Sequence, residues 1–193
     1  MKSIAVFCGS SNGASEEYKK GAIELGKELV KRNITLVYGG ASVGIMGAVA
    51  DSVLNEGGSV IGVIPTFLEK REIFHKNLTE LIIVNSMHER KAKISELSEG
   101  FIALPGGPGT LEEFFEIFTW SQLGLHQKPC GLLNINHYYD PLVTLFDHMT
   151  MEQFMHEKYR KMALVDENPH GLIEQFLTYE PPTVKTYITN NQA

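Results

Sequence analysis

The sequence predicts an α/β protein of one domain, in which helices cover both faces of a mostly parallel, doubly wound sheet. Short apolar runs alternate with longer segments of helical period, which is typical of parallel strands and their crossover helices. The chain of 193 residues is 43% hydrophobic and 21% charged, as expected for a single folded domain. Together these observations predict a three-layer, Rossmann-like fold.

The expected elements follow from the two periodicities. Six apolar runs predict buried strands at residues 4–8, 34–38, 60–64, 81–84, 101–104 and 131–134. Helical spacing predicts helices at residues 14–32, 47–56, 87–98, 110–124 and 138–149. We expect a seventh strand near residues 162–165 and a last helix, capped by Asn168 and opened by Pro169, that ends near Tyr179. The predicted domain spans residues 1–180, and residues 181–193 form a tail that we expect to be flexible.

Charge and composition exclude several classes of protein. The net charge of −6 argues against sequence-independent binding to nucleic acid or to an anionic membrane. The apolar runs are far shorter than the ~20 residues of a spanning helix, and the N-terminus lacks the pattern of a signal peptide. Cys8 and Cys130 lie inside apolar runs, so we expect buried free thiols in a cytoplasmic protein.

Glycine-rich turns follow three of the predicted strands. Because parallel strands end at one edge of a sheet, these turns meet where such folds bind ligands. Glycine lets the backbone approach a ligand, and the next helix offers free N–H groups to an anion, although sharp turns also need glycine for their own geometry. The turns therefore indicate a phosphate-bearing ligand. The candidate phosphate-binding residues are Gly9, Ser10, Gly40, Gly107, Gly109 and Thr110.

Two common phosphate-binding motifs are incomplete. The first turn lacks the glycine spacing of a dinucleotide site, and the second strand ends in Tyr38 and Gly39 without a carboxylate. Gly39 and Gly44 have the spacing of a Walker loop, but Ile45 stands where the lysine belongs. A mononucleotide or a sugar phosphate remains as the ligand. We expect no metal and no cofactor, because no cluster of histidine, cysteine and carboxylate has ligand spacing.

Two helix starts carry the polar residues of interest. Ser86 and Glu89 form a capping box, and the wheel places Arg90 on the apolar side of the helix that follows. An inward arginine in the first turn opposes the helix dipole and needs an anionic partner, either a ligand or a core carboxylate.

The second helix start offers two interpretations of Glu113. Thr110 and Glu113 form a second capping box, in which Glu113 would only reach back to the Thr110 N–H. Alternatively, Glu113 lies with Ile117 and Trp120 on a second apolar side of this helix, facing a partly dry cleft. Because the opposite side would pack on the sheet, the second apolar side predicts a subunit contact and thus a homodimer. The stripe opposite Glu113 consists of Leu111, Phe114, Phe115 and Phe118.

At these residues the chain resembles the lonely-guy family. Residues 105–113 match its PGGxGTxxE motif, and His88, Arg90 and Lys91 match its second signature. Members of that family are N-glycosyl hydrolases of cytokinin biosynthesis, and they cleave N6-modified adenosine 5'-monophosphates to free base and ribose 5-phosphate. The resemblance covers nearly the whole chain and implies this activity. It does not imply lysine decarboxylation, a common label for such sequences, because no pyridoxal phosphate site is marked.

The resemblance also implies roles for individual residues. Arg90 and Glu113 match the catalytic pair, in which we expect Glu113 to stabilise an oxocarbenium-like transition state and either to activate water or to attack directly. We expect Arg90 to hold the phosphate or ribose hydroxyls, or to orient Glu113. His88 faces solvent on the wheel, so the group that protonates the leaving base stays open. The substrate-binding positions implied are Glu72, Lys91, Gly107, Pro108, Gly109, Thr110, Leu111, Glu112 and Thr119.

Two further functions fit the same residues. One is a nucleosidase of the same fold that acts on AMP or another purine monophosphate. The other is a non-catalytic carrier of a nucleotide or of the molybdenum cofactor, which would not need Arg90 and Glu113 together. The sequence does not identify the side chains around an N6 substituent, so it does not separate the first alternative from the family's reaction.

Overall fold

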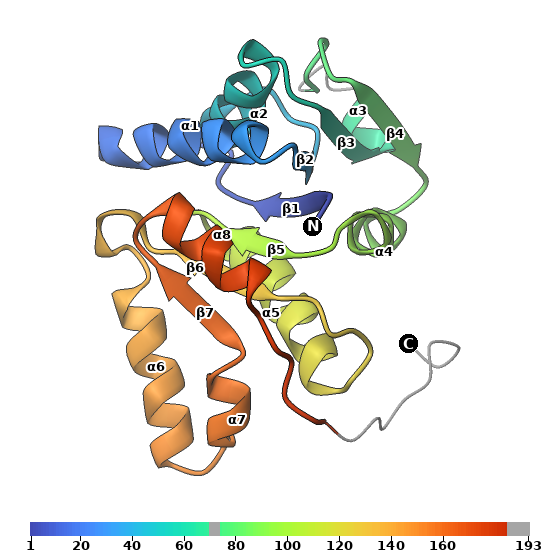
Figure 1. Cartoon of the computed structure of the whole chain (residues 1–193). Coiled ribbons are helices and arrows are strands. Elements are labelled where there is room, and N and C mark those ends of the chain that lie inside the picture. Colours follow the sequence, from blue (N-terminus) through green and yellow to red (C-terminus); the bar gives the residue numbers. More distant parts are fainter. Residues whose placement is uncertain (70–73, 185–193) are drawn as a thin grey trace.

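In the computed structural model, which describes residues 1–69 and 74–184, the strands form one seven-stranded sheet (Figure 1). Its order is β4-β3-β2-β1-β5-β6-β7, and every neighbouring pair is parallel. The strands are β1 Ser3–Phe7, β2 Thr35–Tyr38, β3 Val60–Pro65, β4 Glu80–Val84, β5 Phe101–Ala103, β6 Cys130–Leu133 and β7 Ala163–Asp166. The prediction of a parallel sheet, including its seventh strand, is confirmed.

Helices lie on both faces of this sheet, as predicted. One face packs against α1 Glu16–Lys31, α2 Gly44–Asn55 and α8 Pro169–Leu177. The other packs against α4 Met87–Leu97, α5 Pro108–Gln122 and α6 Asp140–Met151. Three short helices complete the fold, namely α3 Thr66–Glu69, η1 Ile135–His137 and α7 Glu157–Arg160. They are too short to produce the periodicity on which helix prediction depends, so the sequence did not predict them.

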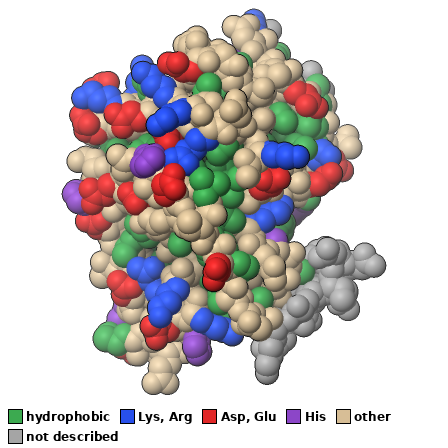
Figure 2. All heavy atoms as spheres, viewed as in Figure 1, with side chains coloured by type: hydrophobic (Ala, Val, Ile, Leu, Met, Phe, Trp, Pro, Cys, Tyr) green, Lys and Arg blue, Asp and Glu red, His purple; other side chains and the backbone are tan. Residues whose placement is uncertain are grey.

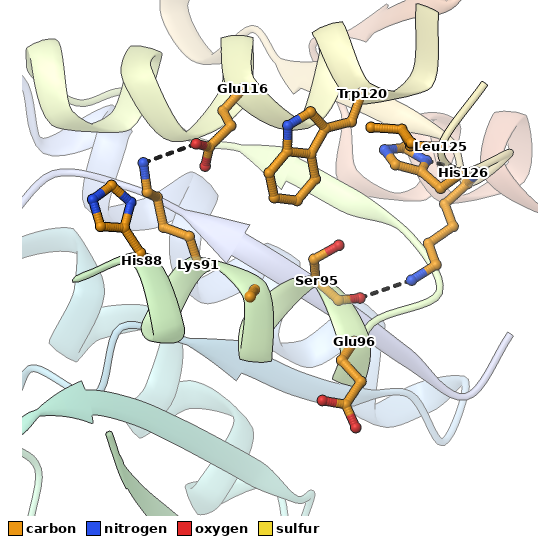
Figure 3. Close-up of a pocket in the computed structure, with 10 residues that line it drawn as sticks. His88, Lys91, Ser95, Glu96, Glu116, Trp120, Leu125 and His126 are labelled. Carbon is orange, nitrogen blue, oxygen red and sulfur yellow. Dashed lines mark hydrogen bonds and ion pairs between the residues drawn. The ribbon is translucent and has the colours of Figure 1, made fainter. Parts of the chain in front are cut away.

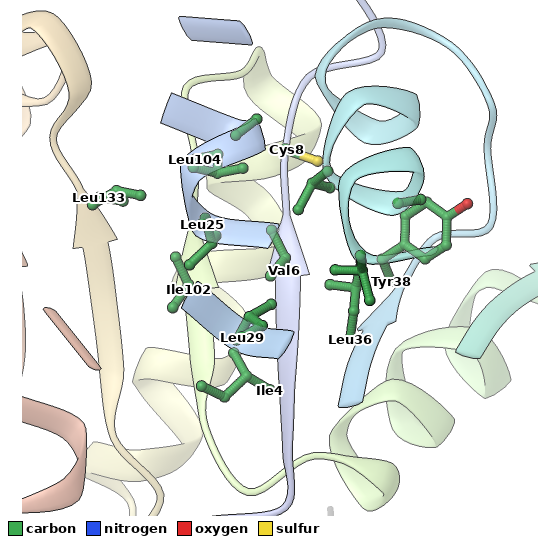
Figure 4. Close-up of a cluster of buried hydrophobic side chains, with 14 of the residues drawn as sticks. Ile4, Val6, Cys8, Leu25, Leu29, Leu36, Tyr38, Ile102, Leu104 and Leu133 are labelled. Atoms are coloured by element: carbon green, nitrogen blue, oxygen red, sulfur yellow. The ribbon is translucent and has the colours of Figure 1, made fainter. Parts of the chain in front are cut away.

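The two helical layers cover two separate apolar clusters. Side chains alternate along β1, so that Ile4 and Val6 pack in the cluster beneath α1 (Figure 4). Ala5 and Phe7 belong to the other cluster, beneath α5. Burying one such aliphatic or aromatic side chain contributes about 1.5–3 kcal/mol. Both cysteines are buried free thiols, as predicted.

The second helix begins earlier than its periodicity predicts. Helix α2 starts at Gly44 rather than at residue 47. Gly44 has a φ of 59°, and a Cβ there would overlap the backbone of Ser10. The glycine therefore lets the start of α2 approach the turn after β1, which brings two of the glycine-rich turns together.

The surface carries no segregated charge on the face drawn in Figure 2, where acidic and basic side chains are interspersed. This mixture is consistent with the modest net charge of −6. Within the described residues, no helix is both long enough and apolar enough to span a bilayer.

Candidate active site

A cavity of about 370 Å³ opens at the carboxyl ends of β1 and β5. Strands β2, β3 and β4 lie on one side of β1, and β5, β6 and β7 on the other, so the loops after β1 and β5 leave in opposite directions. The N–H of Gly9 donates to the carbonyl of Pro105 at 3.1 Å and joins these loops. Side chains and glycines of five segments line the cavity, including Cys8, Gly9, Ser10, Gly39, Met46, Met87, Arg90, Gly107, Pro108, Gly109, Thr110, Glu112 and Glu113.

Helix α4 delivers Arg90 to this cavity. The predicted cap is present, because the Glu89 N–H donates to the Ser86 hydroxyl at 3.1 Å. Arg90 is 8% exposed, and its Nε donates to the carbonyl of Val63 at 3.1 Å. Its Nη1 donates to Oε1 of Glu113 at 2.9 Å. The anionic partner predicted for Arg90 is therefore a carboxylate of the protein, held at the wall of the cavity.

Gly39 makes room for the Arg90 guanidinium. A Cβ at this position would overlap Nη2 of Arg90 and crowd Cε of Met46. The glycine after β2 thus serves the arginine rather than a tight turn.

Helix α5 delivers Glu113, but it begins earlier than predicted. Gly107 is the N-cap and Pro108 is the first helical residue, so the capping box predicted at Thr110 is wrong. Proline is favoured at this position because it lacks the N–H that the first turn leaves unpaired. Thr110 instead donates its N–H to the Gly107 carbonyl at 3.1 Å. Glu113 is consequently not used as a cap, and its carboxylate meets Arg90.

Burial raises the pKa of Glu113, and the positive charge of Arg90 opposes this shift without cancelling it. The side chain of Glu113 is 13% exposed. The pKa of the nearby Cys8 thiol is also raised far above its usual range, first by burial and then by the charge of Glu113. The thiol stays protonated at neutral pH, so Glu113 is the titratable group of interest in the cavity.

The β5–α5 loop presents free donors beside this pair. Within the described ranges, 1–69 and 74–184, no residue accepts a hydrogen bond from the N–H of Gly107 or Gly109. A Cβ at either glycine would meet open space, so conformational need at a crowded turn does not explain them. Unpaired N–H groups at a helix N-terminus form an anion-binding site, which suits a phosphate.

A larger cavity of about 850 Å³ separates α4 from α5 (Figure 3). Nζ of Lys91 bridges the helices, with 2.7 Å to Glu112 and 3.0 Å to Glu116. The second carboxylate oxygen of Glu116 is buried and has no hydrogen-bond partner among the described residues. Trp120 points into the gap, and Leu125 lines its far end (Figure 3).

The second apolar side predicted for α5 is only partly present. Ile117 is buried in the same cluster as Phe114 and Phe118, because α5 sinks further into the core than the wheel suggested. Trp120 alone of the predicted pair faces the gap between the helices.

The remaining predicted residues fall in different places. Gly40 does not line the cavity; its φ is 77° and its carbonyl accepts the N–H of His75, so it shapes the turn. Leu111 packs against the core, and Thr119 is exposed on α5 and lines neither cavity. Glu72 lies outside the described residues. No pattern in the sequence pointed to Met46, which reaches the cavity because α2 starts early.

Comparisons with known proteins identify relatives over most of the chain. The family described as "possible lysine decarboxylase" matches residues 46–176. A probable cytokinin riboside 5'-monophosphate phosphoribohydrolase of Oryza sativa subsp. japonica is 50% identical over 94% of this chain and 74% of its own. A cytokinin riboside 5'-monophosphate phosphoribohydrolase of Arabidopsis thaliana is 48% identical over 94% of this chain and 83% of its own. The enzyme of that name from Rhodococcoides fascians is 48% identical over 89% of this chain and 87% of its own.

Solved structures share the fold at lower identity. The molybdenum cofactor binding protein of Rippkaea orientalis superposes with a TM-score of 0.70 at 21% identity, over 92% of this chain and 96% of that one. The Moco carrier protein of Chlamydomonas reinhardtii superposes with a TM-score of 0.67 at 22% identity, over 92% of this chain and 98% of its own. At such identities the likeness concerns the fold alone. The sequence relatives, in contrast, show that the chain belongs to the lonely-guy family of cytokinin riboside 5'-monophosphate phosphoribohydrolases.

Proposed function

We propose that this protein hydrolyses the N-glycosidic bond of cytokinin riboside 5'-monophosphates, which are N6-modified adenosine 5'-monophosphates, to free base and ribose 5-phosphate. The buried contact between Arg90 and Glu113, beside the unpaired N–H groups of Gly107 and Gly109, carries the proposal. Relatives named for this reaction are 46–50% identical to the chain. "Lysine decarboxylase" is a historical label of the family.

Glu113 is the proposed reactive carboxylate. Departure of the base breaks the C1'–N9 bond, leaves the electron pair on the base and builds positive charge on the ribose. An ionised Glu113 stabilises that charge, and its raised pKa makes it a stronger base toward water than an exposed glutamate. Arg90 favours the ionised form and fixes its orientation through the 2.9 Å contact. Direct attack by Glu113 is the competing route, and trapping of a ribosyl-enzyme would identify it.

The glycine loop is the proposed phosphate site. Gly107 and Gly109 offer N–H groups, and Gly9, Ser10 and Thr110 line the same cavity. Anchoring the 5'-phosphate there fixes the sugar in front of Glu113 without a metal. Lys91 and Glu112 are further proposed binding residues. Glu112 lines this cavity, and Lys91, which lines the neighbouring cavity between α4 and α5, contacts it at 2.7 Å. The family roles of Glu72, Pro108, Leu111 and Thr119 stay predictions.

A homodimer is the proposed assembly. The cavity between α4 and α5 exposes Trp120 and Leu125, and the orphaned oxygen of Glu116 would gain a donor from a second copy. Light scattering should give twice the 21.5 kDa of the chain. Trp120→Ala should weaken the dimer, and the control Phe154→Ala should not, because Phe154 is exposed on the connection between α6 and α7. A 21.5 kDa particle would contradict the proposal.

The two buried free thiols support a reducing, cytoplasmic location. Fractionation of the source cells, with detection of the protein in the cytoplasm, tests this expectation.

An assay of base release tests the proposed reaction. The protein is incubated with N6-isopentenyladenosine 5'-monophosphate, with AMP and with the two free nucleosides, and the products are separated by chromatography. We expect base from the monophosphates only, because the phosphate site anchors the sugar, and faster release from the N6-modified substrate. Faster release from AMP would favour a purine monophosphate nucleosidase. Tight nucleotide binding without release would favour the carrier function.

A further inference from the structure

Two consecutive tyrosines, Tyr138 and Tyr139, donate hydrogen bonds to the loop between β5 and α5. They follow η1, in the connection between β6 and α6 (Figure 1), where Asn136 and His137 have φ values of 51° and 58°. Positive φ at two adjacent non-glycine residues is costly, and it persists only where the surroundings impose it. The amide side chain of Asn134 helps to impose it, by accepting the Tyr139 N–H at 2.6 Å.

Three successive carbonyls of the loop accept hydrogen bonds from outside it. The hydroxyl of Tyr139 donates to the Leu104 carbonyl at 2.6 Å, and the Gly9 N–H donates to Pro105 at 3.1 Å. The hydroxyl of Tyr138 donates to the Gly106 carbonyl at 2.6 Å. Tyr139 is 2% exposed and belongs to the core, whereas Tyr138 is 40% exposed. Because Tyr138 is so exposed, packing of the core does not explain its hydroxyl.

The peptide unit between Gly106 and Gly107 connects this hydroxyl to the candidate active site. In a planar trans peptide the carbonyl of one residue and the N–H of the next point in opposite directions. By holding the Gly106 carbonyl, Tyr138 turns the Gly107 N–H away from itself. Tyr138 lines a separate cavity of about 220 Å³ on its own side of the loop, and Gly107 lines both that cavity and the candidate active site. The unpaired Gly107 N–H is thereby aimed toward the proposed phosphate.

We propose that Tyr138 is a positioning residue, whose hydroxyl sets the phosphate-binding orientation of the β5–α5 loop without touching the substrate. This inference rests on the proposed function for its substrate, but its central claim concerns anion binding and is measurable without turnover. Within the described residues no other group donates a hydrogen bond to the Gly106 carbonyl. Glycine on both sides of the Gly106–Gly107 peptide lets that peptide rotate once the bond is lost, even while the Thr110 N–H holds the Gly107 carbonyl.

The substitution Tyr138→Phe removes the hydroxyl and keeps the ring, which stacks edge-on against Tyr18 with centroids 5.6 Å apart. We expect the KM for the nucleoside monophosphate to rise about fivefold to tenfold with kcat within twofold, as for the loss of one hydrogen bond. Calorimetric titration should show the same loss for ribose 5-phosphate and none for free adenine. The control Tyr18→Phe, in the same small cavity, should change none of these values.

The outcomes separate the inference from the proposed reaction. Weaker binding of ribose 5-phosphate to Tyr138→Phe, with an unchanged melting temperature, supports the positioning role even if the wild-type protein releases no base. Unchanged binding of ribose 5-phosphate overturns it, as does an equal loss for adenine. A wild-type protein that does not bind ribose 5-phosphate at all overturns it too.

Discussion

Two arginine–glutamate contacts in this protein look alike and differ in chemistry. Arg90 meets Glu113 at 2.9 Å, with side chains 10% and 13% exposed. Arg32 meets Glu28 at 2.6 Å, with side chains 17% and 13% exposed. The first contact lines the cavity at the carboxyl ends of the strands. The second lies within the C-terminal end of α1, from which Arg32 also reaches Glu174 of α8. Low exposure and an arginine partner therefore do not distinguish the proposed reactive carboxylate, Glu113, from Glu28.

The direction of the pKa shift does distinguish them. Burial raises the pKa of Glu28, but hydrogen bonds from His170 and Arg32 outweigh burial and hold that pKa below its ordinary value. In the described part of the chain Glu113 has one such donor, Arg90, and its pKa stays raised. A carboxylate left short of donors is held at higher free energy when ionised, which suits it to react.

Lysine in place of each arginine should produce a large contrast between the two contacts. Arg90→Lys keeps the charge but loses the fork that reaches both Val63 and Glu113, so kcat/KM for base release should fall about a hundredfold. Arg32→Lys should leave kcat/KM within twofold. Steady-state kinetics of both variants checks this. Equal losses in the two variants would remove the distinction between the contacts.

The pH dependence of the rate should show the next largest effect. The proposed mechanism requires an ionised Glu113, whose pKa is raised above the ordinary 4.5. We therefore expect an acid limb above pH 4.5, below which kcat/KM falls tenfold per pH unit. Glu28→Gln should show the same limb, because Glu28 lies outside the cavity. An acid limb at or below pH 4.5 in the wild-type profile would be inconsistent with a raised pKa at Glu113.

The smallest effect concerns stability. The folded-state pKa of Glu28 is lowered, so its contribution is present above the ordinary value of 4.5 and is lost as the pH falls through the folded-state value. Glu28→Gln should therefore lower the free energy of unfolding by about 1 kcal/mol at pH 7 and flatten its decline in acid. Urea unfolding at several pH values measures this. A variant as stable as wild type at pH 7 would show that the contact is not structural.

The sequence predicts what is local and periodic. Short sequence patterns predict the strands of the sheet and the helix cap at Ser86. The helical wheel of α4 correctly places Arg90 on the buried side of the helix. The same pattern failed at Thr110, because Pro108 is a stronger start signal than a threonine two residues later. The partner of Arg90 lies 23 residues away, and only the fold brings it to 2.9 Å.

The supporting contacts of the site escape the sequence altogether. Tyr138 reaches Gly106 across 32 residues, through a turn with positive φ at Asn136 and His137 that the sequence did not predict. Met46 reaches the cavity because Gly44 lets α2 begin early. Such contacts depend on tertiary packing, which overrides local preference.

Turnover by two matched amide variants tests the central claim most directly. Glu113→Gln and Glu28→Gln each remove one charge from an arginine contact of similar exposure. With N6-isopentenyladenosine 5'-monophosphate as substrate, base release should fall at least about a thousandfold in Glu113→Gln and stay within twofold of wild type in Glu28→Gln. Wild-type release by a folded Glu113→Gln variant would contradict the assignment of Glu113 as the reactive carboxylate.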